Sequence, residues 1–268
     1  MLLKADLIMI WRLRKMELTE KQQRARKMVC LPLDGLNTMS EVRERVQELS
    51  RVVGLFKVGK ETFTRFGPEA VRAVQEYGAD VFLDLKYHDI PNTVKGAADA
   101  AAALGVYMFN VHASGGLEMM QAAVEGAKAG PEKYGKNMPK ITAVTVLTSI
   151  DQEILNNQLR VPGMVEEQVY NYAQLAHQAG LDGIVCSAAD LHAVRDRLPR
   201  EFMYVTPGIK GTKTPAGADQ KRVFSPGNAV RDGSSILVIG RAITTDRETY
   251  VERLQAGYDI LEDMAQYL

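Results

Sequence analysis

Short apolar runs alternate with longer segments of helical spacing along the chain from residue 29 onward. Apolar runs of this length between turn residues predict buried strands, and the intervening segments predict amphipathic helices. Eight strands are predicted, at residues 29–34, 55–59, 81–86, 106–113, 141–148, 183–187, 202–209 and 236–241. The clearest predicted helices span residues 40–53, 68–77, 94–104, 117–129 and 165–179.

The order of these elements indicates the fold class. Strands that alternate with helices form parallel sheets, and eight such units in about 240 residues are typical of an α/β fold of the (β/α)8 TIM barrel type rather than of an open doubly wound sheet. Gly78, Gly105 and Gly180 stand where three of the helices should end, as glycine commonly does. The start of the first helix is less well defined, because Ser40 and Glu44 do not have the spacing of a capping box.

Residues 1–28 differ from the rest of the chain. They contain eight Lys or Arg and three acidic residues, with an apolar cluster formed by Leu7, Ile8, Ile10, Trp11 and Leu13. Charged residues interrupt this cluster, which argues against a secretory signal, and the acidic residues argue against an organellar transit peptide. We therefore predict a basic amphipathic N-terminal extension over residues 1–28, a single barrel domain over residues 29–268, and a cytoplasmic location.

Composition argues against several classes of protein. The 268 residues are 46% hydrophobic and 25% charged, with a formal net charge of zero, which is typical of a globular domain. Because the chain has no overall basic charge, we expect no binding to nucleic acid or to a membrane, and an anion would have to be bound locally. No apolar stretch approaches the roughly 18 residues of a membrane-spanning helix.

The two cysteines and four histidines do not indicate a metal site. Cys30 and Cys186 each lie within an apolar run, where small buried side chains are expected, and two such cysteines do not make a disulfide framework. The histidines show no ligand spacing. We therefore predict that the protein uses no metal.

The most informative segment is residues 84–93, which read DLKYHDIPNT and follow an apolar run. Successive side chains of a strand point to opposite faces, so Asp84 and Lys86 share one face about 6.6 Å apart. Asp89 follows on the connecting loop, from which we expect it to return to Lys86. Charges placed there are costly to desolvate, so they need partners or a function. Two interpretations remain open at this point: a structural ion pair with Asp89 capping a helix that begins at Pro91, or a catalytic cluster.

Polar residues at the ends of the predicted strands favour the catalytic interpretation. In a barrel these C-terminal ends meet at one rim, which holds the active site in essentially every characterised case. The residues at these ends are Asp34, Lys57, Asp84, Lys86, His112, Thr148, Ser187, Gly208, Lys210, Gly240 and Arg241. Structural ion pairs have no reason to gather at the same end of every strand.

The last two predicted strands end in a pattern typical of phosphate binding. Barrels often hold a phosphate with the loops after strands seven and eight, using glycine amides and a basic side chain. Gly208 and Gly240 would let the backbone approach the anion, and Arg241 offers a planar fork of donors. Residues 211–220 are polar and rich in Gly, Thr and Pro, which suits a loop that closes over a ligand.

The charged cluster suits carbanion chemistry. A lysine held charged between carboxylates is a poor nucleophile and a poor Schiff-base former, but it is a good proton donor to a carbanion. The sequence contains no Walker motif, dinucleotide fingerprint or zinc pattern. The residues alone therefore indicate a cofactor-independent carbanion reaction on a sugar or nucleotide phosphate, and they do not identify the substrate.

Several blocks of sequence, between residue 29 and about residue 250, resemble one known family. The blocks are residues 33–34 (LD), 56–60 (FKVGK), 84–93, 110–116 (NVHASGG), 143–149 (AVTVLTS), 180–187 (GLDGIVCS), 205–209 (VTPGI), 219–220 (DQ) and 239–241 (IGR). The D-x-K-x-x-D core alone is shared with sugar-phosphate relatives. With HDIPNT attached and the other blocks in order, the chain resembles the orotidine 5'-phosphate decarboxylase family of the compact bacterial type.

This resemblance implies roles for the charged residues. Lys86 would protonate C6 of the pyrimidine after CO2 leaves, and Asp84 would face the substrate carboxylate. Lys57 would begin a Lys-Asp-Lys-Asp chain that ends in Asp89, which would reach the ribose of the neighbouring subunit's ligand. The family thus implies a carboxy-lyase that converts orotidine 5'-phosphate to UMP, the last step of de novo pyrimidine nucleotide biosynthesis. It would act without a cofactor, as a homodimer with shared active sites.

The resemblance also implies contacts with the ribose and the base. Asp34 and Lys57 would hold ribose hydroxyls. Thr93 and Thr148 would line the nucleotide site, and Ser149 would read the edge of the pyrimidine.

For the phosphate, the resemblance implies contacts from Gln220, Gly240 and Arg241. The family usually has Arg where this chain has Lys210. Lysine keeps the positive charge but lacks the bidentate fork of arginine, so Lys210 would hold the phosphate less specifically.

Two alternatives remain beside this interpretation. The first is a metal-dependent decarboxylase or aldol-type enzyme that acts on a sugar phosphate with the same D-x-K-x-x-D core. It would need Mg²⁺ and, usually, another carboxylate at a neighbouring strand end, for which His112 and Ser187 are poor candidates. The second is a catalytically silent barrel that binds a nucleotide as a regulatory module, against which the intact acid-base cluster argues.

Overall fold

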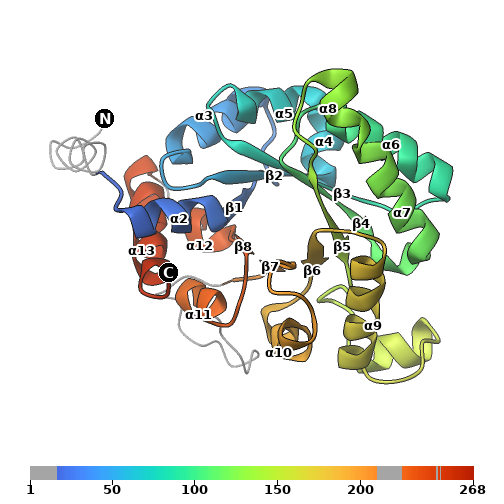
Figure 1. The fold of residues 1–268 in the computed structure, drawn as a ribbon. Helices are drawn as coiled ribbons and strands as arrows, with labels where there is room; N and C mark the ends of the chain where they lie inside the picture. Colours follow the sequence, from blue (N-terminus) through green and yellow to red (C-terminus); the bar gives the residue numbers. More distant parts are fainter. Residues whose placement is uncertain (1–16, 210–224, 246, 248) are drawn as a thin grey trace, which may run out of the picture.

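Eight parallel strands form a closed barrel in the computed structural model, which describes residues 17–209, 225–245, 247 and 249–268 (Figure 1). Each strand pairs with the next along the chain, and β1 closes the ring by pairing with β8. The strands are β1 (Val29–Pro32), β2 (Leu55–Gly59), β3 (Asp80–Tyr87), β4 (Met108–His112), β5 (Lys140–Val144), β6 (Gly183–Val185), β7 (Met203–Pro207) and β8 (Ile236–Val238). The predicted (β/α)8 barrel is confirmed.

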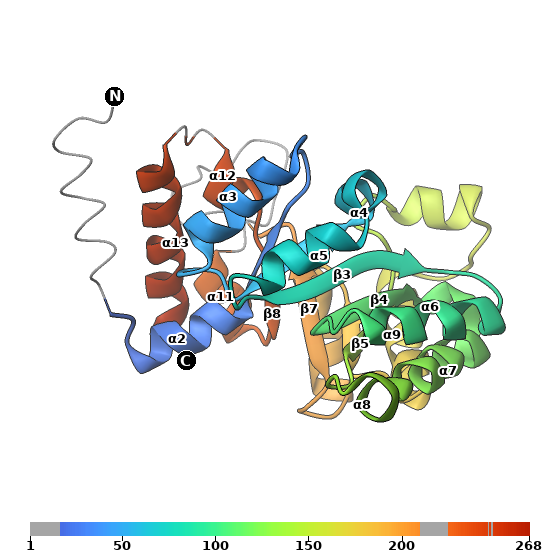
Figure 2. The same ribbon diagram turned by 90° about the horizontal axis from the view of Figure 1, so that it is seen from above.

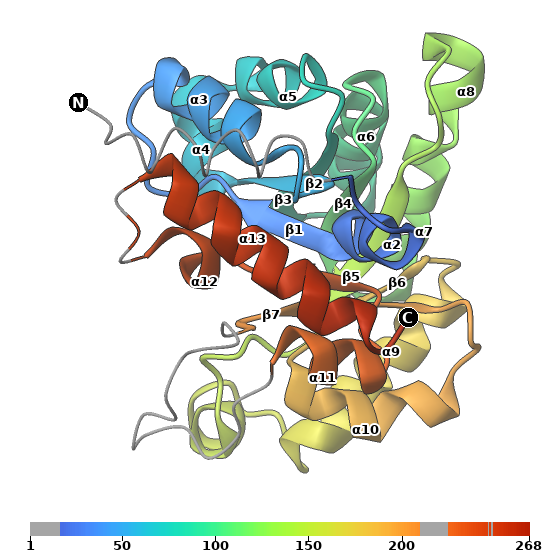
Figure 3. The ribbon, with the colours of Figure 1, turned by 90° about the vertical axis from the view of Figure 1, so that its left-hand side faces the viewer.

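Helices surround the barrel on its outer side (Figures 1 and 3). They are α2 (Glu20–Met28), α3 (Met39–Leu49), α4 (Lys60–Phe66), α5 (Pro68–Gln75), α6 (Pro91–Ala103), α7 (Gly116–Ala127), α8 (Ala129–Tyr134), α9 (Val165–Gln178), α10 (Leu191–Val194), α11 (Pro226–Arg231), α12 (Arg241–Thr244) and α13 (Tyr250–Ala265). Short 3-10 turns lie at Ala113–Gly115, Ala188–Asp190 and Arg195–Arg197, and a π-helical turn lies at Ile154–Gln158.

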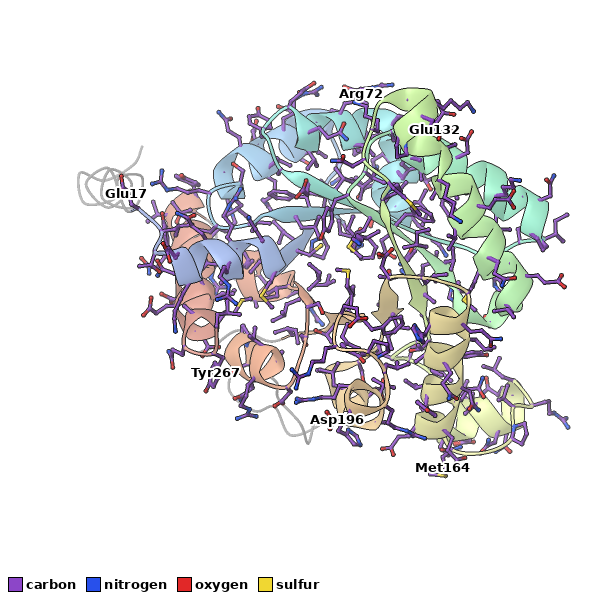
Figure 4. All side chains as sticks on the ribbon, in the orientation of Figure 1. Glu17, Arg72, Glu132, Met164, Asp196 and Tyr267 are labelled. Carbon is purple, nitrogen blue, oxygen red and sulfur yellow. The ribbon has the colours of Figure 1, made fainter. Side chains whose placement is uncertain are left out.

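Alternation along the strands divides the apolar residues between two layers. Outward-facing residues of the strands pack against the helices, while side chains also fill the inside of the barrel (Figure 4). The inner apolar cluster consists of Cys30, Leu55, Phe82, Met108, Val205 and Ile236. Two residues further along β2, β3 and β4, on the same inward face, stand Lys57, Asp84 and Asn110. The inner apolar cluster is therefore the floor on which the polar residues of the rim rest.

Both cysteines are buried, as predicted. Cys30 belongs to the inner apolar cluster, and Cys186 packs with the outer core. Burial raises the pKa of each thiol far above its ordinary value. Neither thiol is therefore available as a thiolate nucleophile at neutral pH.

Strand and helix ends differ from the prediction by a few residues. β1 and β5 end before the predicted termini, so the polar residues that follow them lie on loops. α3 begins one residue before Ser40, because Thr38 is its N-cap and forms a capping box with Glu41. Gly78, Gly105 and Gly180 follow helices with φ of 67°, 67° and 82°, as predicted for glycines that end helices.

Part of the predicted N-terminal extension is helix α2, which lies beside α13 (Figure 2). Its Ala25 is fully buried, and Gln22 donates a 2.8 Å hydrogen bond to Glu262 of α13. Residues 1–16 of the extension lie outside the described part of the chain, so the domain boundary at residue 28 stays a prediction. Among the described residues, no helix combines the length and the apolar character needed to cross a membrane.

Candidate active site

Four charged side chains form a continuous chain at the C-terminal ends of β1, β2 and β3. The Lys57 ammonium lies 2.9 Å from Asp34 Oδ2 and 3.3 Å from Asp84 Oδ2. The Lys86 ammonium lies 2.5 Å from Asp84 Oδ1. The order is thus Asp34, Lys57, Asp84, Lys86, with the sign of the charge alternating along it. Each of the two central groups contacts an opposite charge on both sides.

Burial and charge act in opposite directions on Lys57. Only 9% of Lys57 and 8% of Asp84 is exposed. Burial alone would lower the pKa of Lys57, but the charges of Asp84 and Asp34, with the hydrogen bond to Asp34, outweigh it and raise the pKa. Lys57 is therefore held as an ammonium, and it neutralises one side of the Asp84 carboxylate.

An irregularity in β3 places Lys86 beside Asp84. Leu83 pairs with Phe109 of β4, and the next pair is Tyr87 with Val111, so β3 has two extra residues between these pairs. Lys86 has φ of +53°, one of two positive values among the described residues other than glycine. This backbone departs from the regular strand that the spacing of residues 84–86 predicts, because the extra residues must be accommodated as a bulge.

Asp89 does not return to Lys86, and this part of the prediction is wrong within one chain. The side chain of Asp89 is exposed, and its Oδ1 accepts a 2.7 Å hydrogen bond from the backbone N–H of Ile90. The capping alternative is also wrong, because α6 begins at Pro91 as predicted but its N-cap is Ile90, without a side-chain cap. Asp34, rather than Asp89, supplies the second carboxylate of the described cluster, and it does so at Lys57.

The other predicted contacts lie around the rim and do not bond to this cluster within the described residues. Thr93 is exposed in the first turn of α6, and Thr148 and Ser149 are exposed in the turn after β5. Gly240 is the N-cap of α12, and the exposed Arg241 is its first residue. Lys210 and Gln220 lie outside the described residues, as does the predicted closing loop at residues 211–220.

The last group at this rim is a pair of histidines. The rings of His88 and His112 lie 5.3 Å apart, centroid to centroid. Burial, followed by the charges of His88, Lys60 and Lys86, lowers the pKa of His112 to about 4. His112 is therefore neutral at physiological pH, in surroundings where the nearby lysines supply the positive charge.

Comparison with known families agrees with this geometry. The model of the orotidine 5'-phosphate decarboxylase / HUMPS family matches residues 27–255, which include all eight strands and the whole charged cluster. The chain belongs to this family.

Relatives and solved structures support the same assignment to the orotidine 5'-phosphate decarboxylase / HUMPS family. The chain is 50% identical over 213 residues to an orotidine 5'-phosphate decarboxylase of Syntrophus aciditrophicus, covering 80% of this chain and 84% of the relative. It is 51% identical over 202 residues to the enzyme of the same name from Moorella thermoacetica, covering 74% and 79%. The crystal structure of the orotidine 5'-phosphate decarboxylase of Lactobacillus acidophilus has a TM-score of 0.76 at 34% identity, covering 88% of this chain and 98% of that one.

One residue in contact with the charged cluster was not assigned a role from the sequence. Asn110 of β4 is 1% exposed and donates a 2.7 Å hydrogen bond from Nδ2 to Asp84 Oδ1. It lies in the NVHASGG block that carries the family resemblance. The sequence does not indicate, however, which group an isolated polar residue inside an apolar strand bonds to. Alternation along the strand could have found it. Asn110 lies two residues before His112, so both share the inward face of β4.

Proposed function

We propose that the protein decarboxylates orotidine 5'-phosphate to UMP, the last step of de novo pyrimidine nucleotide biosynthesis, without a cofactor. Family membership and the names of relatives at about half identity support the decarboxylase activity and its place in pyrimidine synthesis. The observation that carries the chemistry is the Asp84–Lys86 pair at the end of β3, with Lys57 on the other side of the carboxylate.

In this proposal, Lys86 is the proton donor. The bond between C6 of the pyrimidine and the carboxylate carbon breaks, CO2 leaves, and the electron pair remains at C6. The Lys86 ammonium stabilises this developing charge and then transfers its proton to C6, giving UMP and a neutral amine that solvent reprotonates. Asp84 is already held by Lys57 and Lys86, so the ammonium of Lys86 is fixed near the reacting carbon before the bond breaks.

Asp84 would face the substrate carboxylate. A carboxylate at this position repels the ionised group of the bound substrate, and the repulsion is lost when that group leaves as neutral CO2. The burial of Asp84 supports this role, because the interaction between two charges strengthens where water is excluded. Because Lys57 and Lys86 contact Asp84 from two sides, the carboxylate can stay charged despite its burial.

The remaining residues would bind the rest of the nucleotide. Asp34 and Lys57 would hold the ribose hydroxyls, and the 42% exposure of the Asp34 side chain leaves it accessible from the rim. Thr93, Thr148 and Ser149 would contact the nucleotide and its base. Their exposed positions support this assignment, because Thr93 lies in the first turn of α6 and the other two lie in the turn after β5, at the C-terminal ends of the strands.

The phosphate would be bound at the ends of β7 and β8. Gly240 and Arg241 are adjacent at the start of α12, where a backbone N–H and a guanidinium can face the same anion. Gln220 and Lys210 complete the predicted phosphate site.

We propose further that the active enzyme is a cytoplasmic homodimer in which Asp89 completes the partner's site. Asp89 is exposed and makes no ion pair among the described residues, and its neighbour Ile90 is 66% exposed. A large exposed apolar side chain next to an exposed carboxylate suits a surface that a second copy of the chain covers. Lys60, Lys86 and the two histidines supply the positive and polar groups that such a carboxylate would approach.

Decrease of the orotate absorbance with orotidine 5'-phosphate as substrate, measured with and without EDTA, tests the proposed reaction. We expect turnover at the same rate in both conditions. Activity that is lost in EDTA and restored by Mg²⁺ would assign the protein to the metal-dependent sugar-phosphate alternative. Binding of the nucleotide without any turnover would indicate the regulatory alternative.

A further inference from the structure

The bulge in β3 faces a single residue of the neighbouring strand. Between the pairs Leu83–Phe109 and Tyr87–Val111, three residues of β3 lie opposite Asn110 alone. In a regular parallel ladder, alternate backbone N–H groups of β3 would bond to carbonyl groups of β4. The two extra residues break this register opposite Asn110, so an N–H group of this stretch needs another acceptor.

Asn110 supplies that acceptor from its side chain. Its Oδ1 accepts a 2.8 Å hydrogen bond from the backbone N–H of Lys86, while its Nδ2 donates a 2.7 Å hydrogen bond to Asp84 Oδ1. The same Asp84 oxygen lies 2.5 Å from the Lys86 ammonium. One amide group therefore links the backbone of Lys86 with the carboxylate that its side chain contacts.

This link matters because the backbone of Lys86 has a left-handed conformation. A left-handed conformation is unfavourable for a residue other than glycine, and it persists only where the surroundings fix it. If residue 86 returned to an extended conformation, the direction of its side chain would change relative to the strand. The bond from Lys86 N–H to Asn110 opposes that change, since losing it would leave a buried donor unpaired.

We propose that Asn110 is a positioning residue for the decarboxylation, acting through Lys86 and Asp84 without touching the substrate. The predicted effect on kcat rests on the proposed function. The predicted effect on the backbone conformation of Lys86 rests on the geometry alone. Asn110 holds Lys86 in the left-handed bulge and orients the Asp84 carboxylate by a donor at Oδ1. Asn110 is 1% exposed and follows Met108 of the inner apolar cluster by two residues, on the same inward face of β4.

Asn110→Leu tests the proposal by removing both hydrogen bonds while keeping the number and branching of the side-chain heavy atoms. We expect kcat to fall on the order of 10²-fold, as a displacement of about 1 Å costs at a reacting group, with KM changed less than threefold. Thr142→Val is the matched control, because Thr142 pairs with Asn110 on β5, is fully buried, and its hydroxyl has no hydrogen-bond partner among the described residues. The control should keep kcat within about twofold of wild type.

Asn110→Asp distinguishes a positioning role from a packing role through the pH profile of kcat. The new carboxylate keeps an acceptor for Lys86 N–H but faces Asp84 at hydrogen-bond distance, and two such carboxylates hold one proton between them until the pH is raised. With one shared proton the aspartic acid donates as the amide did, and as pH rises the proton is lost and kcat falls. The other ionisable groups near this pair are Lys57, Lys86, His112, Cys30 and Asp34, which wild type shares. We therefore expect an alkaline loss of kcat in Asn110→Asp that wild type and Asn110→Leu do not have.

Three results would overturn the proposal. The first is a kcat for Asn110→Leu within threefold of wild type, and the second is an Asn110→Asp profile parallel to that of wild type. The third is a crystal structure of Asn110→Leu in which residue 86 keeps its positive φ. If Asn110→Leu does not fold, the Asn110→Asp profile decides. If wild type fails to turn over orotidine 5'-phosphate, the proposed function fails, and the backbone of residue 86 in the variant still decides the positioning role.

Discussion

The two halves of segment 84–93 are held in opposite ways. Asp84 and Lys86 are fixed within the subunit, by each other, by Lys57 and by Asn110. From His88 to Thr93 every residue is exposed, and Asp89 bonds only to the adjacent backbone N–H within the described residues. Ten consecutive residues therefore contain a preorganised acid-base pair and, directly after it, a carboxylate without a partner charge.

This difference indicates a division of labour. In the proposed function, Asp84 and Lys86 act on the reacting carbon, and groups with that role need a fixed geometry. Contacts with β2 and β4 supply this geometry. The second half protrudes from the rim with a charged and an apolar side chain, which suits contact with another molecule of the same chain. Variants of the two halves test this difference.

Lys86→Ala should have the largest effect, because it removes the proposed proton donor from the fixed half. We expect kcat to fall by several orders of magnitude, since general acid catalysis alone contributes about 10²–10⁴-fold and electrostatic stabilisation adds to it. Steady-state kinetics with orotidine 5'-phosphate measure the loss. The control is Lys95→Ala, which removes an exposed lysine paired with Glu125 on the surface. A loss below tenfold for Lys86→Ala would remove its assigned role.

Mixing variants tests the exposed half. If Asp89 completes the partner's site, Lys86→Ala and Asp89→Ala homodimers are both impaired, but a mixed dimer has one site with both lesions and one with neither. After full random exchange, half the dimers are mixed, so activity should recover toward about a quarter of wild type. Native mass spectrometry verifies the exchange.

A second mixture provides the control for this experiment. Lys57 and Lys86 belong to one chain's cluster, so every site in a mixture of Lys57→Ala and Lys86→Ala keeps one lesion and no activity should return. If the Asp89 mixture behaves like this control, Asp89 acts within its own subunit and the shared site is wrong.

Arg241→Ala should have an intermediate effect that is confined to the phosphate. We expect UMP to bind roughly 10- to 100-fold more weakly, the loss typical of a hydrogen bond to a charged group, while uridine binding stays unchanged. Isothermal titration calorimetry with both ligands measures the difference. Arg231→Ala, an exposed arginine on α11 paired with Asp232, is the matched control. Equal weakening for both ligands would place Arg241 outside the phosphate site.

The smallest effect concerns stability at low pH. The pKa of His112 is about 4 in the folded protein and near 6.5 when unfolded, so between these values the unfolded chain binds the proton and the folded chain does not. Stability from this source is present above pH 6.5 and is lost as pH falls toward 4. His112→Gln should therefore show a smaller decrease of Tm than wild type over this range, and the exposed His192→Gln should not. Equal decreases in wild type and His112→Gln would contradict the burial of a neutral His112.

The sequence predicted the barrel because its apolar runs and glycines reflect local rules. A run such as residues 81–83 is buried whatever its partners are, and Gly105 ends a helix by its own conformation. The ion pair of Asp84 with Lys86 was also predictable, since both lie on one strand.

What the sequence did not reveal depends on contacts between distant residues. The left-handed conformation of Lys86 depends on a register shift against β4 and on Asn110, 24 residues away, and neither is visible in residues 84–86. Reasoning from local spacing likewise chose Asp89 as the second carboxylate of the cluster, whereas Asp34 comes from the loop after β1 and contacts Lys57 across the rim.

The apolar floor of the barrel has a consequence for how protons and electric fields reach the site. Among the described residues, Cys30, Leu55, Phe82 and Met108 close the interior below Lys57 and Asp84, so water approaches the cluster from the rim. A hydrocarbon layer screens charge poorly, whereas water screens it well. Before a ligand binds, water therefore weakens the field of the cluster at the rim, which is the side that a ligand covers. A nucleotide that enters displaces that water and removes the screening. Binding of the substrate thus strengthens the electrostatic interaction between the cluster and the substrate itself.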